Sequence, residues 1–476
     1  MKMMRFALGA LTCCGLMVQQ ASAQQTSLSS SIQEVTYKYF LDEGDADKSS
    51  AQKGKKKAAQ KSAAQKSKKN GGKKSAAQKG KKNGGKKSAA QKSAAAKSAS
   101  KAKCGCDDAN GKGKGGLNFL NRMCVEHKAP WSLADHGKKG KGHGISISGH
   151  TQLGWHDDGE NGTGVLNSFN DNPNSLQLHQ QWLTVAKAAQ GGGDVDWGFR
   201  MDWLYGTDGP DAQSFGNAAG EWDEAWDHGG NYGHALPQLY AEVAMGDLRV
   251  KGGHFLSPLG YESVNSTENF FYSRSYGRGI EGFIPRTVTG VQADYAVGEN
   301  LTAHGGWVNG YDTGFGSTNG SMFLGGATLS LANGMDINYM LLSSDDVYAH
   351  SIAVARQLTD RIHTVFESVL RTDTTGSGQR SSATQITLNN YVFYDLNDCM
   401  KVGLRSEWVD MGRDSEEFNA VTVGINYQAT GNLMLRPEIR MDNFHSDIND
   451  ASNNGGIGAL GRRDSTVFGF DAIWSY

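Results

Sequence analysis

Hydrophobic and polar residues alternate along the last twelve residues of the chain, 465–476. One set of alternate positions is mostly apolar and aromatic: Thr466, Phe468, Phe470, Ala472, Trp474 and Tyr476. The other set is small and mostly polar: Val467, Gly469, Asp471, Ile473 and Ser475. Because successive side chains of a β-strand point to opposite faces, this segment is predicted to form a strand with one apolar and one polar face. A soluble domain would bury the apolar face, whereas a membrane barrel would turn it toward lipid.

The same pattern recurs upstream, so that sixteen candidate strands can be laid out from Ile145 onward. Most are 9 to 13 residues long, a length that crosses a bilayer when a strand is tilted. The alternation is blurred at 321–332 and 362–371. The predicted strands span 145–155, 176–188, 195–205, 237–245, 248–256, 286–297, 301–309, 321–332, 335–343, 348–358, 362–371, 383–395, 400–409, 419–428, 433–443 and 465–476.

Short and long connections alternate between these segments. The short ones are 189–194, 246–247, 298–300, 333–334, 359–361, 396–399 and 429–432. The others are mostly longer, 156–175, 206–236, 257–285, 310–320, 372–382, 410–418 and 444–464, and only 344–347 breaks the trend. Bacterial outer-membrane barrels have short periplasmic turns and longer outer loops, whereas a soluble β-sandwich gives no reason for the alternation. The chain is therefore predicted to be all-β, with a transmembrane antiparallel β-barrel of about 16 strands over 144–476.

The N-terminal region differs from the predicted barrel in composition. Residues 1–23 carry Lys2 and Arg5, then an apolar run and an Ala-Ser-Ala cleavage site, which predicts a secretory signal peptide. Residues 24–50 form a short mixed segment. An exported chain with this barrel is expected in the cell outer membrane, with its N-terminal segment in the periplasm.

Residues 51–103 form a low-complexity segment rich in Lys, Ala, Gln and Gly. It contains 19 Lys and no acidic residue, whereas 144–476 contains 18 Lys and Arg against 40 Asp and Glu, a balance of -22. A segment without aromatic or β-branched residues cannot bury a core, so disorder is expected. It would act either as a solvated spacer or as a tether for a cell-wall polyanion. Nucleic acid is not an expected partner, because no aromatic residues interleave with the lysines.

Four cysteines remain after cleavage, and three of them lie in the predicted periplasmic linker 104–143. The disulfide candidates are Cys104, Cys106, Cys124 and Cys399, which allow three pairings. Zinc binding by the linker cysteines and His127 is the alternative, but an oxidising compartment favours disulfides. We therefore expect no metal.

Several segments of the predicted barrel resemble a known family. They include Ala235-Leu-Pro-Gln-Leu-Tyr240, Gly253-His-Phe-Leu-Ser-Pro-Leu-Gly-Tyr-Glu262 and Asn269-Phe-Phe-Tyr-Ser-Arg274. These segments resemble the bacterial outer-membrane β-barrel porins of the OmpL-like type, over about residues 144–476. The resemblance implies a porin, but it implies neither a particular solute nor particular site residues.

A barrel of about sixteen strands leaves a lumen wide enough for water, so its inward residues should be polar. Opposed arginines and carboxylates across such a lumen would orient polar solutes. The alternative is that these charges merely pair between neighbouring strands. The pore-lining candidates are Arg200, Asp202, Glu242, Arg249, Lys251, Arg405, Glu407, Arg436, Glu438, Arg440 and Asp442.

Two long connections contain further candidate residues. The third long connection is too aromatic for a free surface loop, so it is expected either to fold into the barrel and narrow it or to contact another subunit of a homo-oligomer, such as a trimer. Its constriction candidates are Tyr261, Phe270, Phe271, Tyr272, Arg274, Tyr276 and Arg278. Connection 206–236 is acidic, and its carboxylates are expected to form a plain external surface rather than a weak Ca²⁺ site.

No catalytic motif occurs in the chain, since it lacks His-Glu-x-x-His, Gly-x-Ser-x-Gly and phosphate-binding loop patterns. We expect neither an enzyme nor a cofactor. The leading hypothesis is passive diffusion of small polar solutes or ions through an outer-membrane porin, with cation preference because the barrel is acidic. The alternative is a structural protein whose Lys-rich arm binds cell-wall polyanion while the barrel anchors it in outer-membrane lipid.

Overall fold

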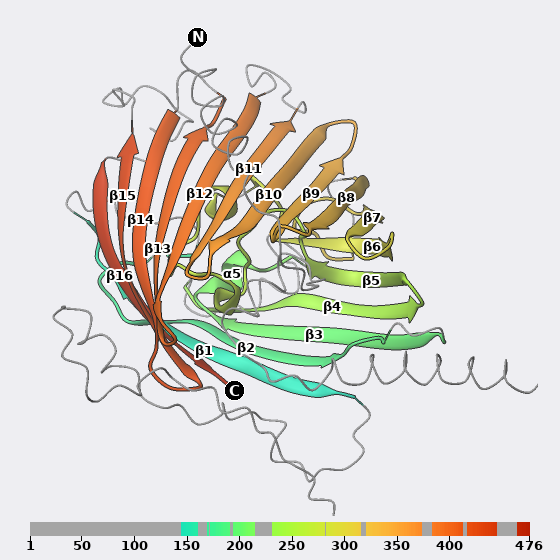
Figure 1. Ribbon diagram of the computed structural model, residues 1–476, viewed down its shortest axis with the longest axis horizontal. Coiled ribbons are helices and arrows are strands. Elements are labelled where there is room, and N and C mark those ends of the chain that lie inside the picture. Colours follow the sequence, from blue (N-terminus) through green and yellow to red (C-terminus); the bar gives the residue numbers. More distant parts are fainter. Residues whose placement is uncertain are drawn as a thin grey trace, which may run out of the picture. The chain divides into compact units, whose positions relative to one another are not determined.

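A computed structural model describes residues 144–159, 169–170, 172–190, 194–214, 231–280, 282–315, 320–373, 383–412, 417–444 and 464–476. Figure 1 shows the strands as one continuous curved wall, coloured in sequence order from β1 to β16. Their bounds are β1 (Ser146–His156), β2 (Gln177–Lys187), β3 (Asp196–Gly206), β4 (Gly233–Met245), β5 (Leu248–Leu256), β6 (Thr287–Ala296), β7 (Leu301–Val308), β8 (Met322–Leu331), β9 (Met335–Ser343), β10 (Val347–Thr359), β11 (Ile362–Asp373), β12 (Ala383–Asn397), β13 (Met400–Asp410), β14 (Glu417–Gln428), β15 (Leu433–Phe444) and β16 (Ser465–Ser475).

The sheet closes on itself. Each strand pairs antiparallel with its sequence neighbours, and β1 pairs with β16 in a register that sets Thr151 opposite Trp474. Closure leaves no strand edge with unpaired backbone N–H and C=O groups, which is the condition for a sheet that crosses lipid. The prediction of an all-β antiparallel barrel of sixteen strands is confirmed.

The connections at the two ends of the barrel differ in length. At one end they are short: 188–195, 246–247, 297–300, 332–334, 360–361, 398–399 and 429–432. At the other end they are 157–176, 207–232, 257–286, 309–321, 344–346, 374–382, 411–416 and 445–464. We call these the short-turn end and the long-loop end. Both β1 and β16 have their free ends at the short-turn end, as an even number of strands requires.

The two faces of the wall differ in chemistry, as the alternation predicts. On β15 and β16 the apolar side chains of Ile439, Phe468 and Trp474 are exposed on the outer face. The alternate residues, such as Arg436 and Asp471, are buried on the inner face. On these two strands the wall therefore has an apolar outer face and a charged inner face.

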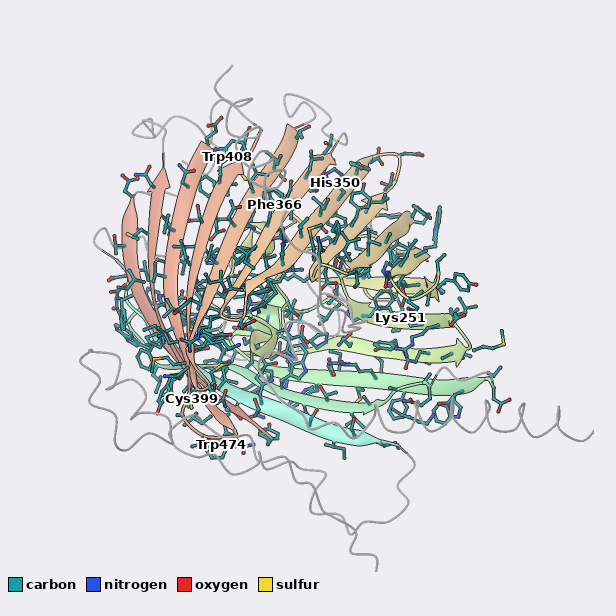
Figure 2. The ribbon with its side chains drawn as sticks, viewed as in Figure 1. Lys251, His350, Phe366, Cys399, Trp408 and Trp474 are labelled. Carbon is teal, nitrogen blue, oxygen red and sulfur yellow. The ribbon has the colours of Figure 1, made fainter. Side chains whose placement is uncertain are left out.

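The predicted segments 1–23, 24–50, 51–103 and 104–143 lie outside the described residues. Cys399 lies in the β12–β13 connection, where it is buried and disulfide-bonded (Figure 2), while Cys104, Cys106 and Cys124 lie outside the described part. No helix among the described residues is long and apolar enough to cross a membrane.

Candidate functional site

The connection between β5 and β6, residues 257–286, folds over the inner face of the barrel, and we call it the inner loop. It contains η3 (Ser266–Glu268) and α6 (Tyr276–Gly279). The start of η3 is capped by Asn265, whose side chain accepts a hydrogen bond from the backbone N–H of Thr267 at 3.0 Å. The loop therefore has ordered local structure before its contacts with the wall are considered.

Three glutamates of the wall accept hydrogen bonds from backbone N–H groups of the inner loop. Tyr261 donates to Glu367 on β11, Tyr276 to Glu407 on β13, and Tyr272 and Ser273 to Glu438 on β15, at 2.6 to 3.1 Å. A buried backbone N–H group must find an acceptor. The wall carboxylates thus provide acceptors that the loop does not find within itself, and this fixes the loop inside the barrel.

Three arginines of the same wall donate to backbone carbonyls of the inner loop. Arg405 donates to Ser273, Arg436 to Ser266 and Asn269, and Arg440 to Arg274, at 2.7 to 3.0 Å. Each arginine also has a carboxylate partner: Glu262 and Glu407 for Arg405, Asp471 for Arg436, and Asp442 for Arg440. A buried charge is tolerated only when it is paired and hydrogen-bonded, and these arginines meet both conditions.

Glu262 is the carboxylate that the inner loop contributes to this network. Its Oε1 lies 2.8 Å from Nη1 of Arg405, and its Oε2 accepts from the backbone N–H of Ser275 at 2.6 Å. Burial opposes ionisation of Glu262, but the Arg405 guanidinium and the Ser275 N–H outweigh it and hold the pKa of Glu262 below its ordinary value. Glu262 is therefore ionised at neutral pH.

Arg278 joins the two ends of the inner loop. Its guanidinium donates to the carbonyl oxygens of Leu259 at 2.6 Å and Pro285 at 3.0 Å. Burial lowers the pKa of Arg278 to about 10, so the side chain stays charged at neutral pH. The loop is thereby closed at its base.

The inner loop also packs against the wall opposite the arginines. Leu259, Phe283 and Ile284 of the loop and Phe255 of β5 form one apolar cluster with inward side chains of β7 to β11. Those wall residues are Val308, Met322, Leu324, Met340, Leu342, Ala349 and Val369. On a third side, Ser266 hydrogen-bonds to Gln152 of β1 and Gln180 of β2. The loop is thus attached to several parts of the wall rather than to one.

Glycine at position 403 makes room for the aromatic part of the inner loop. A Cβ at Gly403 would lie 2.4 Å from the ring of Phe270, which is closer than any real contact. The Phe270 ring also packs against Phe393 of β12, with ring centroids 4.8 Å apart. The inner face of β12 and β13 is therefore shaped to accept this side chain.

The pore-lining candidates fall into two groups. The six on β13 and β15 are all buried: Arg405, Glu407, Arg436, Glu438, Arg440 and Asp442. The first five of these form hydrogen bonds with the inner loop. The five on β3 to β5 are Arg200, Asp202, Glu242, Arg249 and Lys251. Of these, Asp202 and Glu242 are buried, whereas Arg200, Arg249 and Lys251 are partly or fully exposed. The alternation in the sequence predicted that all eleven lie on the inner face of the barrel. It did not predict which of them the inner loop would cover.

The constriction candidates all lie in the inner loop, and all except Tyr261 are buried. Arg274 donates to the carbonyl oxygen of Val264 at 3.0 Å, and Tyr276 packs edge-to-face on Phe418 of β14. The other five, Tyr261, Phe270, Phe271, Tyr272 and Arg278, contact the wall or the loop itself.

Several residues of the network were not among the sequence candidates. They include Gln152, Gln180, Glu262, Glu367 and Asp471. Asp471 lies on the polar side of the last strand, so alternation alone could have selected it. Glu262 could not be selected in this way, because it lies in a connection that has no period.

In the acidic connection 206–236, one described carboxylate is buried and the other is partly exposed. Asp208, in α5 (Asp208–Asp211), is buried and accepts from Gln180 at 2.7 Å, and Asp211 lies 3.9 Å from Arg286. Glu221, Asp223, Glu224 and Asp227 lie outside the described residues. Among the described residues no group of His, Cys, Asp or Glu side chains is placed to hold a metal ion.

Comparison with known proteins gives one match to a family model. Residues 144–476, which include every strand of the barrel, match the model described as putative beta-barrel porin-2, OmpL-like. A search of curated proteins found no match.

Solved structures similar to this chain include three porin-type proteins. The outer membrane channel DcaP of Acinetobacter baumannii is 10% identical with a TM-score of 0.45, and the match covers 73% of this chain and 100% of that one. A mutant porin of Rh. blastica is 13% identical with a TM-score of 0.43, covering 70% and 100%. OmpT of Vibrio cholerae is 11% identical with a TM-score of 0.42, covering 70% and 97%. At these scores we draw no functional conclusion from the structures.

Proposed function

We propose, from the premise that the chain belongs to the putative beta-barrel porin-2, OmpL-like family, that its barrel is a passive diffusion channel for small polar solutes or ions. A barrel of sixteen strands is wide enough to enclose an aqueous channel. The apolar exterior is suited to outer-membrane lipid, and the charged interior is suited to water. A passive channel needs no catalytic group.

The observation that carries this proposal is the attachment of the inner loop to the inside of the wall. The loop hydrogen-bonds to β11, β13 and β15 and packs against β7 to β10. A loop held inside a barrel reduces the cross-section open to solutes. We therefore assign to the inner loop, including Tyr261, Phe270 and Tyr276, the role of narrowing the channel.

Liposome swelling with neutral sugars of increasing size tests this function. Purified protein in liposomes should admit small sugars at a rate that falls steeply with solute size, because the loop leaves only part of the barrel open. Liposomes prepared with heat-denatured protein are the control. Swelling no faster than in this control for every sugar would refute passive diffusion.

We further propose that the channel prefers cations. The support is the acidic balance of the barrel region, 18 Lys and Arg against 40 Asp and Glu. Fixed negative charge in and around a pore concentrates cations and repels anions. The reversal potential in a KCl gradient should then have the sign of K⁺ selectivity, and a Cl⁻-selective potential would contradict it.

The proposals for the N-terminal region rest on sequence alone. We propose that 51–103 is a periplasmic arm that binds cell-wall polyanion, because 19 Lys without an acidic residue favour such a partner. Deleting 51–103 should then release the protein from isolated cell wall while leaving solute diffusion unchanged. Retention of cell-wall binding after the deletion would contradict this role and would favour a solvated spacer.

A further inference from the structure

Lys251 on β5 has an ammonium group that Asp294 and Glu242 attract without forming an ion pair with it. Its Nζ lies 4.2 Å from the ring centroid of Phe255 and 5.8 Å from that of Tyr240, and these two rings meet edge-to-face. Within the described part of the chain, no carboxylate lies within salt-bridge distance of this ammonium group and no acceptor is hydrogen-bonded to it. Figure 2 labels Lys251 on the β5 part of the wall.

Lys251 occupies an inward position toward the short-turn end of the barrel. Phe255, four residues along the same strand and on the same face, belongs to the apolar cluster that holds the inner loop. Lys251 is partly exposed, whereas Phe255 is fully buried. The ammonium group therefore lies beside the Phe255 ring, on the side nearer the short-turn end.

Two neighbouring polar atoms also have no hydrogen-bond partner among the described residues. Gln292 lies opposite Lys251 in the β5–β6 register. Its amide nitrogen donates to Asp294 at 2.7 Å, but its Oε1 is buried and accepts no hydrogen bond from the described residues. The hydroxyl group of Tyr240, on the adjacent strand β4, likewise has no hydrogen-bond partner among them. Within the described part of the chain, an amide oxygen and a phenol without hydrogen-bond partners thus lie on the two strands that flank Lys251.

The carboxylates of this wall are already occupied by other partners. Glu242 accepts from the backbone N–H of Ala189 at 2.6 Å and lies 4.0 Å from Arg249. Asp294 pairs with His304 at 2.7 Å. Among the described residues of β3 to β5, Arg200 and Arg249 have carboxylate partners, so a solute can reach Lys251 without first breaking an ion pair.

Water is the simplest partner for a lumen lysine, and most exposed lysines need no other. Here two aromatic rings displace part of the hydration of the ammonium group, and the buried Gln292 Oε1 has no donor among the described residues. A ligand that meets all three groups has a carboxylate for Lys251, a hydroxyl donor for Gln292 and an aliphatic face for the rings. These are the features of a small hydroxylated organic anion.

We propose that Lys251, Tyr240, Phe255 and Gln292 form a lumen subsite for small hydroxylated carboxylates. This inference rests on the proposed channel function, because the solute must enter the barrel to reach it. It concerns one class of solute and is compatible with average cation preference, which is set by the acidic balance of the whole barrel region.

Saturation-transfer NMR on the purified full chain in detergent tests the subsite, with gluconate as the probe. Wild-type protein should show saturable gluconate binding and little binding of glucose, which has hydroxyl groups but no charge. Lys251→Met keeps the aliphatic stem against Phe255 and should weaken gluconate binding about tenfold, which corresponds to about 1.4 kcal/mol. Lys251→Arg should keep most of the binding.

Lys401→Met is the matched control, because Lys401 is an inward lysine already paired with Asp395 at 3.3 Å. It should leave gluconate binding unchanged. Equal gluconate binding by wild type and Lys251→Met, equal binding of glucose and gluconate, or no saturable gluconate binding would each overturn the subsite. The NMR measurement needs no conduction, so a failed swelling assay with retained gluconate binding would refute the channel and not the subsite.

Discussion

At the scale of single residues, buried charged side chains of the wall form hydrogen bonds with the inner loop. Arg405 is fully buried and joins two carboxylates, Glu262 from the loop and Glu407 from its own strand. Such a network need not stabilise the protein more than apolar residues would, but it is costly to break on one side. Here the network holds the inner loop against β13 and β15.

Replacing Arg405 with methionine should destabilise the protein strongly. Glu262 and Glu407 would lose a buried partner, which typically costs about 3 to 5 kcal/mol. Urea titration in detergent, followed by tryptophan fluorescence, measures this loss of unfolding free energy. Arg249→Met is the control, because Arg249 is half exposed and lies 4.0 Å from Glu242, so its loss should cost about 0 to 1 kcal/mol. Equal effects of the two substitutions would contradict the network.

The docking of the inner loop should weaken in acid through Glu262. Burial raises the pKa of Glu262, but the Arg405 guanidinium and the Ser275 N–H outweigh burial and hold this pKa below the ordinary 4.5. The stabilising contribution of the ionised Glu262 is therefore present above pH 4.5. It is lost as the pH falls through the lowered pKa. Protease cleavage of the loop should therefore increase in wild type as the pH falls below 4.5.

Glu262→Gln isolates this effect, because the amide does not titrate. Glu268, in η3, acts in the opposite direction: burial raises its pKa, so its contribution is present at low pH and lost as the pH rises. Only the difference between wild type and Glu262→Gln therefore reports on Glu262. An identical acid response of the two proteins would rule out Glu262 as the titrating group.

At the scale of elements, the alternation in the sequence predicted the strands, but it did not predict the position of the inner loop. The period of two predicted 248–256 to the residue, and β4 differs only by beginning at Gly233 instead of 237. The inner loop has no such period. Its partners Glu367, Glu407 and Glu438 lie more than 100 residues further along the chain, so their meeting depends on closure of the barrel.

The fit between the inner loop and the wall can be tested at one glycine. Gly403→Val would place side-chain atoms where the Phe270 ring lies, so the loop should shift away from β13. Increased protease cleavage of the loop, with the barrel still folded, is the expected result. Gly305→Val is the control, since a Cβ at Gly305 on β7 meets nothing within 4 Å. Unchanged cleavage in Gly403→Val would contradict the observed packing.

At the scale of the whole molecule, closure between the first and last strands makes the barrel. β16 pairs with β15 on one side and with β1 on the other. A deletion of β16 would leave two long open edges, whose unpaired backbone groups cannot be satisfied in lipid. The apolar exterior, the polar interior and the inner loop all depend on this one closure.

Deletion of residues 465–476 should therefore prevent formation of a stable barrel. The intact protein is expected to migrate differently on SDS gels before and after heating, because a closed barrel resists the detergent until it is heated. The truncated protein should show no such shift and should aggregate. A truncated protein that keeps the heat-dependent shift would show that closure by β16 is dispensable.

The most direct test of a channel narrowed by the inner loop is planar-bilayer recording. The wild type is compared with a variant in which 261–283 is replaced by a short Gly-Ser linker. If the barrel is an aqueous channel narrowed by the inner loop, wild type should give small conductance steps in KCl, and the shortened variant should give steps several-fold larger. The absence of conductance from both proteins, or steps of equal size, would contradict it.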